Sequence, residues 1–151
     1  MTDLNFEDIV GRYFNLNLKK NNYRIYVEEA GQGTPLLCLH TAGSDGRQFR
    51  HILNDKRITN NYRVIVFDLP WHGKSNPPEG YELKDYKLTT NLYKEIIMSF
   101  CKQYKLIDPV IMGCSMGGRV VLHLALEHCD YFKAVIALEG SDKLEPYYDL
   151  D

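Results

Sequence analysis

The chain has 151 residues, of which 44% are hydrophobic and 25% are charged, an ordinary composition for one globular domain with a buried core. A formal net charge of −2 gives no indication of a nucleic-acid partner or of binding to an anionic membrane surface. No signal peptide and no apolar run of membrane-spanning length can be recognised, so we expect a cytoplasmic protein. The four cysteines show no CxxC spacing, and we expect no disulfide framework, metal site or organic cofactor.

The first part of the chain predicts a helix and then a β-hairpin. Apolar side chains recur at helical spacing in residues 3–12, which predicts a short amphipathic helix. Residues 13–18 and 23–27 alternate apolar with polar side chains, the pattern of a hairpin with one solvent-exposed face. The next apolar stretch, residues 36–39, is continuous, and this change indicates an antiparallel edge that leads into a buried parallel sheet.

The remainder alternates strands with helices. The strands are predicted at residues 62–69, 110–112 and 133–138, and the helices at residues 47–56, 88–104 and after residue 115. This alternation requires right-handed βαβ crossovers, so the predicted fold class is α/β: a mostly parallel twisted sheet with helices on both faces and an N-terminal antiparallel hairpin. Ligands of such sheets bind beyond the carboxyl ends of the strands, where Ser115 and the loops at His40, Asp68 and Glu139 are expected.

Residues 113–117, Gly-Cys-Ser-Met-Gly, match the pattern G-x-S-x-G, in which a serine lies on a tight turn between a strand and a helix. Glycines are needed there because such a turn presses the residues two before and two after the serine against each other. Ser115 therefore lies at a helix N-terminus, where free N–H groups favour an anion. The alternative interpretation of Ser115 is a serine that only caps the helix.

Three motifs together resemble the α/β-hydrolase superfamily. They are the segment 39–44 with its His40, the segment 68–75, which is similar to the D-x-P-G-x-G-x-S loop of the family, and the serine turn at residues 113–117. The motifs occur in this order, each at the end of a predicted strand, and the resemblance covers nearly the whole chain. It implies an α/β-hydrolase fold with Ser115 as the nucleophile.

The resemblance also implies roles for neighbouring residues. Ser115 would attack a carbonyl carbon to give an acyl-enzyme, and the backbone N–H groups of Met116 and Ala42 would form the oxyanion hole. Two residues depart from the family pattern, since Thr41 and Trp71 stand where glycine is usual. Trp71, at the edge of the expected site, is a candidate for lining a substrate pocket or for packing.

The resemblance further implies that residues 1–151 form a single, incomplete core domain, with strands 1 to 6 but without the lid and the last strands. The acid and the general-base histidine of the family usually follow later strands. Glu139 is a minor candidate for the acid, and none of the five histidines fits the base. We therefore expect a missing C-terminal segment or a second chain to complete the sheet, with residues 142–151 at most the start of the lid.

The function that follows is a serine hydrolase acting on a small-molecule acyl substrate, a carboxylic ester or a related carbonyl compound. A C–C hydrolase or a perhydrolase on the same scaffold stays open, because these residues do not separate the three reactions. A hydrolase-like binding module without catalysis is the non-enzymatic alternative. An enzyme needs a histidine and an acid from outside the 151 residues, whereas a binding module does not.

Overall fold

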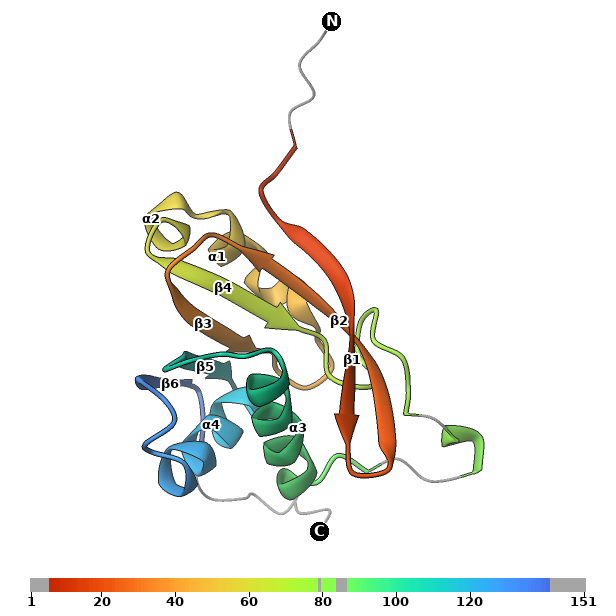
Figure 1. Ribbon diagram of the computed structural model, residues 1–151. Helices are drawn as coiled ribbons and strands as arrows, with labels where there is room; N and C mark the ends of the chain where they lie inside the picture. The colour runs from red at the N-terminus through yellow and green to blue at the C-terminus, as the bar shows by residue number, and fades with distance from the viewer. Residues whose placement is uncertain (1–5, 79, 84–86, 142–151) are drawn as a thin grey trace, which may run out of the picture.

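The computed structural model describes residues 6–78, 80–83 and 87–141, which form a six-stranded sheet (Figure 1). The strands follow one another across the sheet in the order β1-β2-β4-β3-β5-β6. Their bounds are β1 Val10–Leu18, β2 Asn21–Ala30, β3 Thr34–Leu39, β4 Tyr62–Phe67, β5 Val110–Cys114 and β6 Ala134–Leu138. β1 and β2 form an antiparallel hairpin, β2 is antiparallel to β4, and β4, β3, β5 and β6 are parallel. The predicted mixed sheet with its N-terminal hairpin is confirmed.

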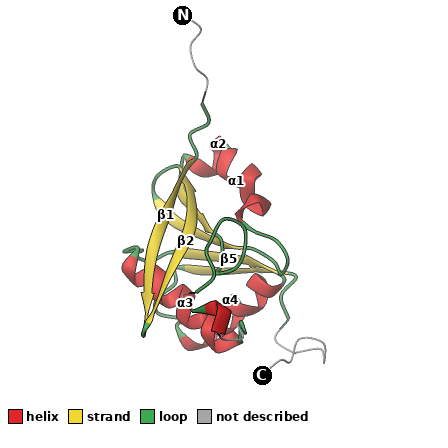
Figure 2. Cartoon of the chain, turned by 90° about the vertical axis from the view of Figure 1, so that its right-hand side faces the viewer, coloured by secondary structure: helices red, strands yellow, loops and turns green. Residues whose placement is uncertain are grey.

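Helices cover both faces of this sheet, as predicted. Their bounds are η1 Gly46–Phe49, α1 Arg50–Asn54, α2 Lys56–Thr59, η2 Tyr81–Leu83, α3 Thr90–Gln103 and α4 Met116–Glu127. In β3, Leu37 and Leu39 pack into the core beneath α3 and α4, whereas Leu36 and Cys38 pack with Phe49 into the core on the side of η1 and α1. Figure 2 shows the sheet from the side, with α1 and α2 away from α3 and α4. None of the described helices has the length and apolarity that a membrane span requires.

The prediction of a helix at residues 3–12 is wrong for residues 6–12. Residues 3–5 lie outside the part of the chain that the structure describes. Residues 6–9 are not helical, and β1 begins at Val10, which pairs with Glu29. Gly11 lies directly against the ring of Tyr26. A Cβ at Gly11 would be only 2.0 Å from the Tyr26 Oη, so a side chain has no space at this position. Pairing of β1 with β2 therefore outweighs the short helical pattern of this segment, which Gly11 weakens further.

The single helix predicted at residues 47–56 is three short pieces, η1, α1 and α2. Asp55 has an extended backbone (φ −85°, ψ 108°) that ends α1, and its carboxylate accepts a hydrogen bond from the Arg57 N–H to begin α2. Asp45 caps η1 in the same way through the Arg47 N–H. Aspartate is a strong N-cap, so Asp45 begins η1 near the predicted start of the helix, and Asp55 begins α2 where the apolar pattern alone predicts continuity.

The α3 core is organised around Phe100, whose side chain is fully buried. Its ring stacks on Phe67 at 4.6 Å and on Tyr104 at 4.8 Å, and meets Phe14 edge-on at 5.8 Å between ring centroids. These contacts join β1, β4 and the end of α3, so one side chain links three elements.

We expect Phe100→Ala to lower the free energy of unfolding by about 4 kcal/mol, because a buried aromatic ring is lost and a cavity remains. Phe6→Ala is the matched control, since Phe6 is 80% exposed, and it should change the stability by less than about 0.5 kcal/mol. Urea unfolding of both variants measures the difference. Equal losses in the two variants would contradict the central position of Phe100.

Candidate functional site

Ser115 occupies the turn between β5 and α4, with a strained backbone at φ 52° and ψ −111°. Its N–H donates to the Leu138 carbonyl at 2.8 Å, and its carbonyl accepts from the Arg119 N–H at 2.8 Å. The side chain makes no capping hydrogen bond to α4, which argues against the interpretation of Ser115 as a helix cap. A non-glycine residue with positive φ costs about 1–3 kcal/mol and persists only where the surroundings enforce it.

Two glycines make this turn possible by allowing backbone atoms to approach closely. A Cβ on Gly113 would lie 2.2 Å from the Gly117 carbonyl oxygen, which is the contact predicted between the positions two before and two after Ser115. A Cβ on Gly117 would lie 2.5 Å from the Leu39 carbonyl oxygen and 3.0 Å from that of His40. The start of α4 therefore lies directly against the loop that follows β3.

The loop after β3 contains the second expected oxyanion donor. Residues 41–44 form a turn in which the Ser44 N–H donates to the Thr41 carbonyl at 3.3 Å. The Thr41 N–H donates to the Gln48 side chain at 2.9 Å, which anchors the position where the family pattern has glycine. Among the described residues, neither the Ala42 N–H nor the Met116 N–H has an acceptor. Both donors remain available to an oxyanion, which is compatible with the predicted role.

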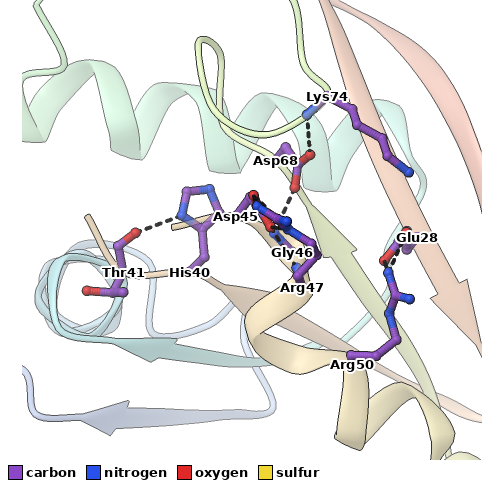
Figure 3. Close-up of polar contacts among 9 residues, drawn as sticks. All are labelled: Glu28, His40, Thr41, Asp45, Gly46, Arg47, Arg50, Asp68 and Lys74. Carbon is purple, nitrogen blue, oxygen red and sulfur yellow. Dashed lines mark hydrogen bonds and ion pairs between the residues drawn. The ribbon is translucent and has the colours of Figure 1, made fainter. Parts of the chain in front are cut away.

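His40 is fully buried, and its ring is hydrogen-bonded to Thr41 at the start of the loop (Figure 3). Its Nε2 accepts a hydrogen bond from the Leu69 N–H at 3.2 Å, so we assign the ring proton to Nδ1, which donates to the Thr41 carbonyl at 2.9 Å. Its ring also packs on His72 at 5.0 Å between centroids. Burial lowers the pKa of His40, and both ring nitrogens are engaged, so this histidine is not a general base for Ser115.

Asp68, at the end of β4, connects two loops through its carboxylate (Figure 3). Oδ1 accepts from the Gly46 N–H at 2.7 Å, and Oδ2 accepts from the Lys74 N–H at 2.8 Å. Ser75 completes the connection, because its hydroxyl donates to the Asp68 carbonyl at 2.6 Å and accepts from the Tyr26 N–H at 2.8 Å. The sequence analysis did not predict these roles. The polar side chains of Asp68 and Ser75, at the two ends of the motif 68–75, could have indicated hydrogen bonds that hold this loop.

Trp71 adopts a left-handed backbone with φ 68°, which explains why glycine is usual at this position. Its side chain is 46% exposed and meets the ring of Tyr81 edge-on at 5.6 Å. This contact with Tyr81 agrees with the interpretation of Trp71 as a packing residue.

The described residues do not complete a catalytic triad. No described histidine is hydrogen-bonded to Ser115, and His72 makes its own contact through Nδ1 to the Pro70 carbonyl oxygen at 3.0 Å. Glu139 follows β6 with φ 51° and is exposed, so it stays a minor candidate for the acid. Within the described ranges, no cluster of three His, Cys, Asp or Glu side chains is arranged to hold a metal ion.

We expect Gly113→Ala to destabilise the fold by about 3 kcal/mol, since the new methyl group would overlap a backbone oxygen that has no free space. Gly80→Ala is the control, because nothing lies within 4 Å of a Cβ at that position and only its positive φ of 76° is penalised, by about 1 kcal/mol. Urea unfolding separates the two effects, and similar losses would show that the close contact at the turn is unimportant.

The lowered pKa of His40 predicts a pH effect on stability. An unfolded histidine has a pKa of about 6.5, so below that pH the unfolded chain binds a proton that the folded protein excludes, and the free energy of unfolding falls. His72, Asp68 and Asp45 face this ring, and the pKa of Asp45, lowered to about 2 chiefly by its hydrogen bond with Arg47, places its effect at a more acidic pH.

Melting temperatures measured between about pH 7.5 and about pH 5.5 should therefore fall with pH in the unmodified protein, and less steeply in His40→Gln. His51→Gln is the matched control, because His51 is exposed, and it should keep the original slope. A slope that is unchanged in His40→Gln would contradict this assignment.

Comparison with known proteins gives consistent results. A family model described as "alpha/beta hydrolase fold" matches residues 34–151. A pimeloyl-[acyl-carrier protein] methyl ester esterase of Vibrio vulnificus is 27% identical over 119 residues, 79% of this chain and 42% of the relative. A putative non-heme haloperoxidase of Mycobacterium phage D29 is 25% identical over 80% of this chain and 41% of its own length. The chain thus spans less than half the length of these relatives.

Solved structures agree on the fold. A putative aryl esterase from Burkholderia cenocepacia superposes with a TM-score of 0.75 at 23% identity, over 90% of this chain and 49% of that one. An epoxide hydrolase from Vigna radiata superposes with a TM-score of 0.72 at 21% identity, over 87% and 38%. The family model covers most of the chain, so the chain belongs to the α/β-hydrolase family.

Proposed function

We propose that Ser115 is the nucleophile of a serine hydrolase that cleaves carboxylic esters or related carbonyl compounds. The observation that carries the proposal is the conformation of Ser115: a strained turn at the start of α4, with a hydroxyl that caps nothing. A helix N-terminus with free N–H groups stabilises the negative charge that develops on a carbonyl oxygen under attack.

In the proposed reaction, the Ser115 Oγ attacks the carbonyl carbon of the ester and loses its proton to a general base. The oxygen of the tetrahedral intermediate receives hydrogen bonds from the N–H groups of Met116 and Ala42. Expulsion of the alcohol, which takes up the proton, leaves an acyl group on Ser115, and water then releases the acid by the same steps. Loss of one oxyanion donor typically lowers the rate about 100- to 1000-fold, so the turn at residues 41–44 matters for catalysis as much as Ser115.

The general base and its acid are proposed to come from outside residues 1–151, from a further segment of the protein or from a second chain. The engagement of both His40 nitrogens supports this, and so does the length of the relatives, which is more than twice that of the part they share with this chain. A serine without a base is a weak nucleophile at neutral pH, so we expect residues 1–151 alone to be inactive.

An ester substrate is favoured over the alternatives because the relative from Vibrio vulnificus is named a methyl ester esterase. The similarity to a putative haloperoxidase supports a perhydrolase as the second candidate. In that reaction the same serine would form the acyl-enzyme, and hydrogen peroxide in place of water would attack it.

A fluorophosphonate probe, which labels activated serines, tests the proposal on the natively produced protein. We expect one adduct by intact mass, absent in Ser115→Ala and retained in the control Ser99→Ala. Ser99 lies on α3, and its hydroxyl donates a hydrogen bond to the Asn17 carbonyl oxygen of β1. An adduct that survives Ser115→Ala would refute the assignment of the nucleophile. A native protein that forms no adduct would instead support the binding-module alternative.

A further inference from the structure

A cavity of about 330 Å³ lies on the α3 side of the sheet, outside the proposed catalytic site. It exists because α3 ends at Gln103, whereas β1, β2 and β4 continue beyond the end of this helix (Figure 1). Arg63 is the second residue of β4, so the cavity lies at the amino end of this strand, and Ser115 follows the carboxyl end of β5. The two sites therefore belong to different ends of the sheet.

The cavity is lined by three cations and a single carboxylate. The Glu29 carboxylate, only 13% exposed, is shared by two guanidinium groups: Arg12 Nη2 lies 3.2 Å from Oε1, and Arg63 donates to Oε2 from Nε at 2.9 Å and from Nη2 at 2.6 Å. Lys105 adds the third positive charge. One carboxylate cannot neutralise three cations, so the cavity has an excess positive charge.

The C-terminus of α3 adds a partial negative charge, which opposes this excess. Its carbonyl groups are, however, largely satisfied within the chain: the Tyr104 N–H donates to the Phe100 carbonyl at 2.7 Å, and the Leu106 N–H donates to that of Cys101 at 2.9 Å. The excess positive charge of the three cations over Glu29 outweighs this remaining dipole.

Two aromatic side chains, Phe14 and Tyr104, line the cavity beside the cations. The Arg63 guanidinium lies 5.3 Å from the centre of the Tyr104 ring, and Phe14 packs edge-on against that ring at 5.2 Å. Burial raises the pKa of the Tyr104 phenol, and the charge of Glu29 adds to this, so the hydroxyl is neutral and can donate a hydrogen bond. Glu29 and Tyr104 together hold Arg63 in place, which lowers the entropy lost when it binds a ligand.

We infer that this cavity binds a small organic anion, a planar ring that carries a carboxylate or phosphate group. The anionic group would contact the N–H groups of Arg12, Arg63 and Lys105 that face away from Glu29, and the ring would pack against Tyr104 and Phe14. Guanidinium groups suit both anions because their planar donors match a pair of oxygens. The volume agrees with this ligand size, since small-molecule sites begin at about 300 Å³. This site is independent of the proposed function.

Calorimetric titration of the natively produced protein tests the inference with four probes: benzoate, phenyl phosphate, neutral benzamide and inorganic phosphate. We expect saturable binding of benzoate and phenyl phosphate that weakens with added salt, and at least about tenfold weaker binding of benzamide, which lacks the charge. Inorganic phosphate should bind more weakly than phenyl phosphate, because it lacks the ring. Equal binding of benzamide and benzoate, or no saturable binding of either anion, would overturn the inference.

Two variants locate the site. Arg12→Gln and Lys105→Gln remove exposed charges of the lining, and each should weaken benzoate binding about tenfold. Lys133→Gln removes an exposed lysine next to β6 and should leave the affinity unchanged. Thermal melting of each variant shows that the fold is intact. If the two lining variants bind benzoate as tightly as the control, the site is elsewhere and the inference is wrong.

Discussion

The close approach of three backbone segments around Ser115 is the constraint on which the site depends. Gly113, Gly117 and Leu39 lie so near to one another that a single added methyl group would overlap a carbonyl oxygen. This contact forces the tight turn, gives Ser115 its positive φ and brings α4 against the loop after β3. Without it, the two expected oxyanion donors would belong to separate parts of the surface. Backbone packing, more than any side chain, therefore makes the geometry that the proposed chemistry needs.

The loops beside Ser115 are held by buried polar groups that do not themselves react. His40 joins Thr41 to Leu69, and Asp68 joins Gly46 to Lys74, so the loops after β3 and β4 support each other. Both residues are buried, where an unpaired polar group would be costly, and each is satisfied by backbone N–H or carbonyl groups. Preorganised loops of this kind would keep the proposed oxyanion donors in place before a substrate arrives.

Much of this arrangement was predictable from the sequence, because continuous apolar strands, helical spacing and the G-x-S-x-G pattern are local signals. The sheet class, the hairpin and the contact between Gly113 and Gly117 follow from them. The failed predictions depended on two kinds of interaction that apolar spacing does not record, strand pairing and helix capping. Residues 3–12 gave a helical pattern, but β2 offers residues 10–12 a strand partner, and this pairing decided the outcome there. Asp55 separated α1 from α2 through a capping bond to the Arg57 N–H.

The charged cavity and the role of Asp68 were beyond the reach of the sequence for a related reason. Arg12, Glu29 and Arg63 are far apart in the chain, and only the strand order β1-β2-β4 places them on one face. β6 shows a similar dependence on context: its residues alternate between half-buried and exposed, whereas most residues of β3, β4 and β5 are buried. An edge strand with Ile136 and Leu138 exposed is suited to pairing with a further strand. The Leu138 carbonyl at the end of this strand accepts the hydrogen bond of the Ser115 N–H, so the edge strand also supports the turn at Ser115.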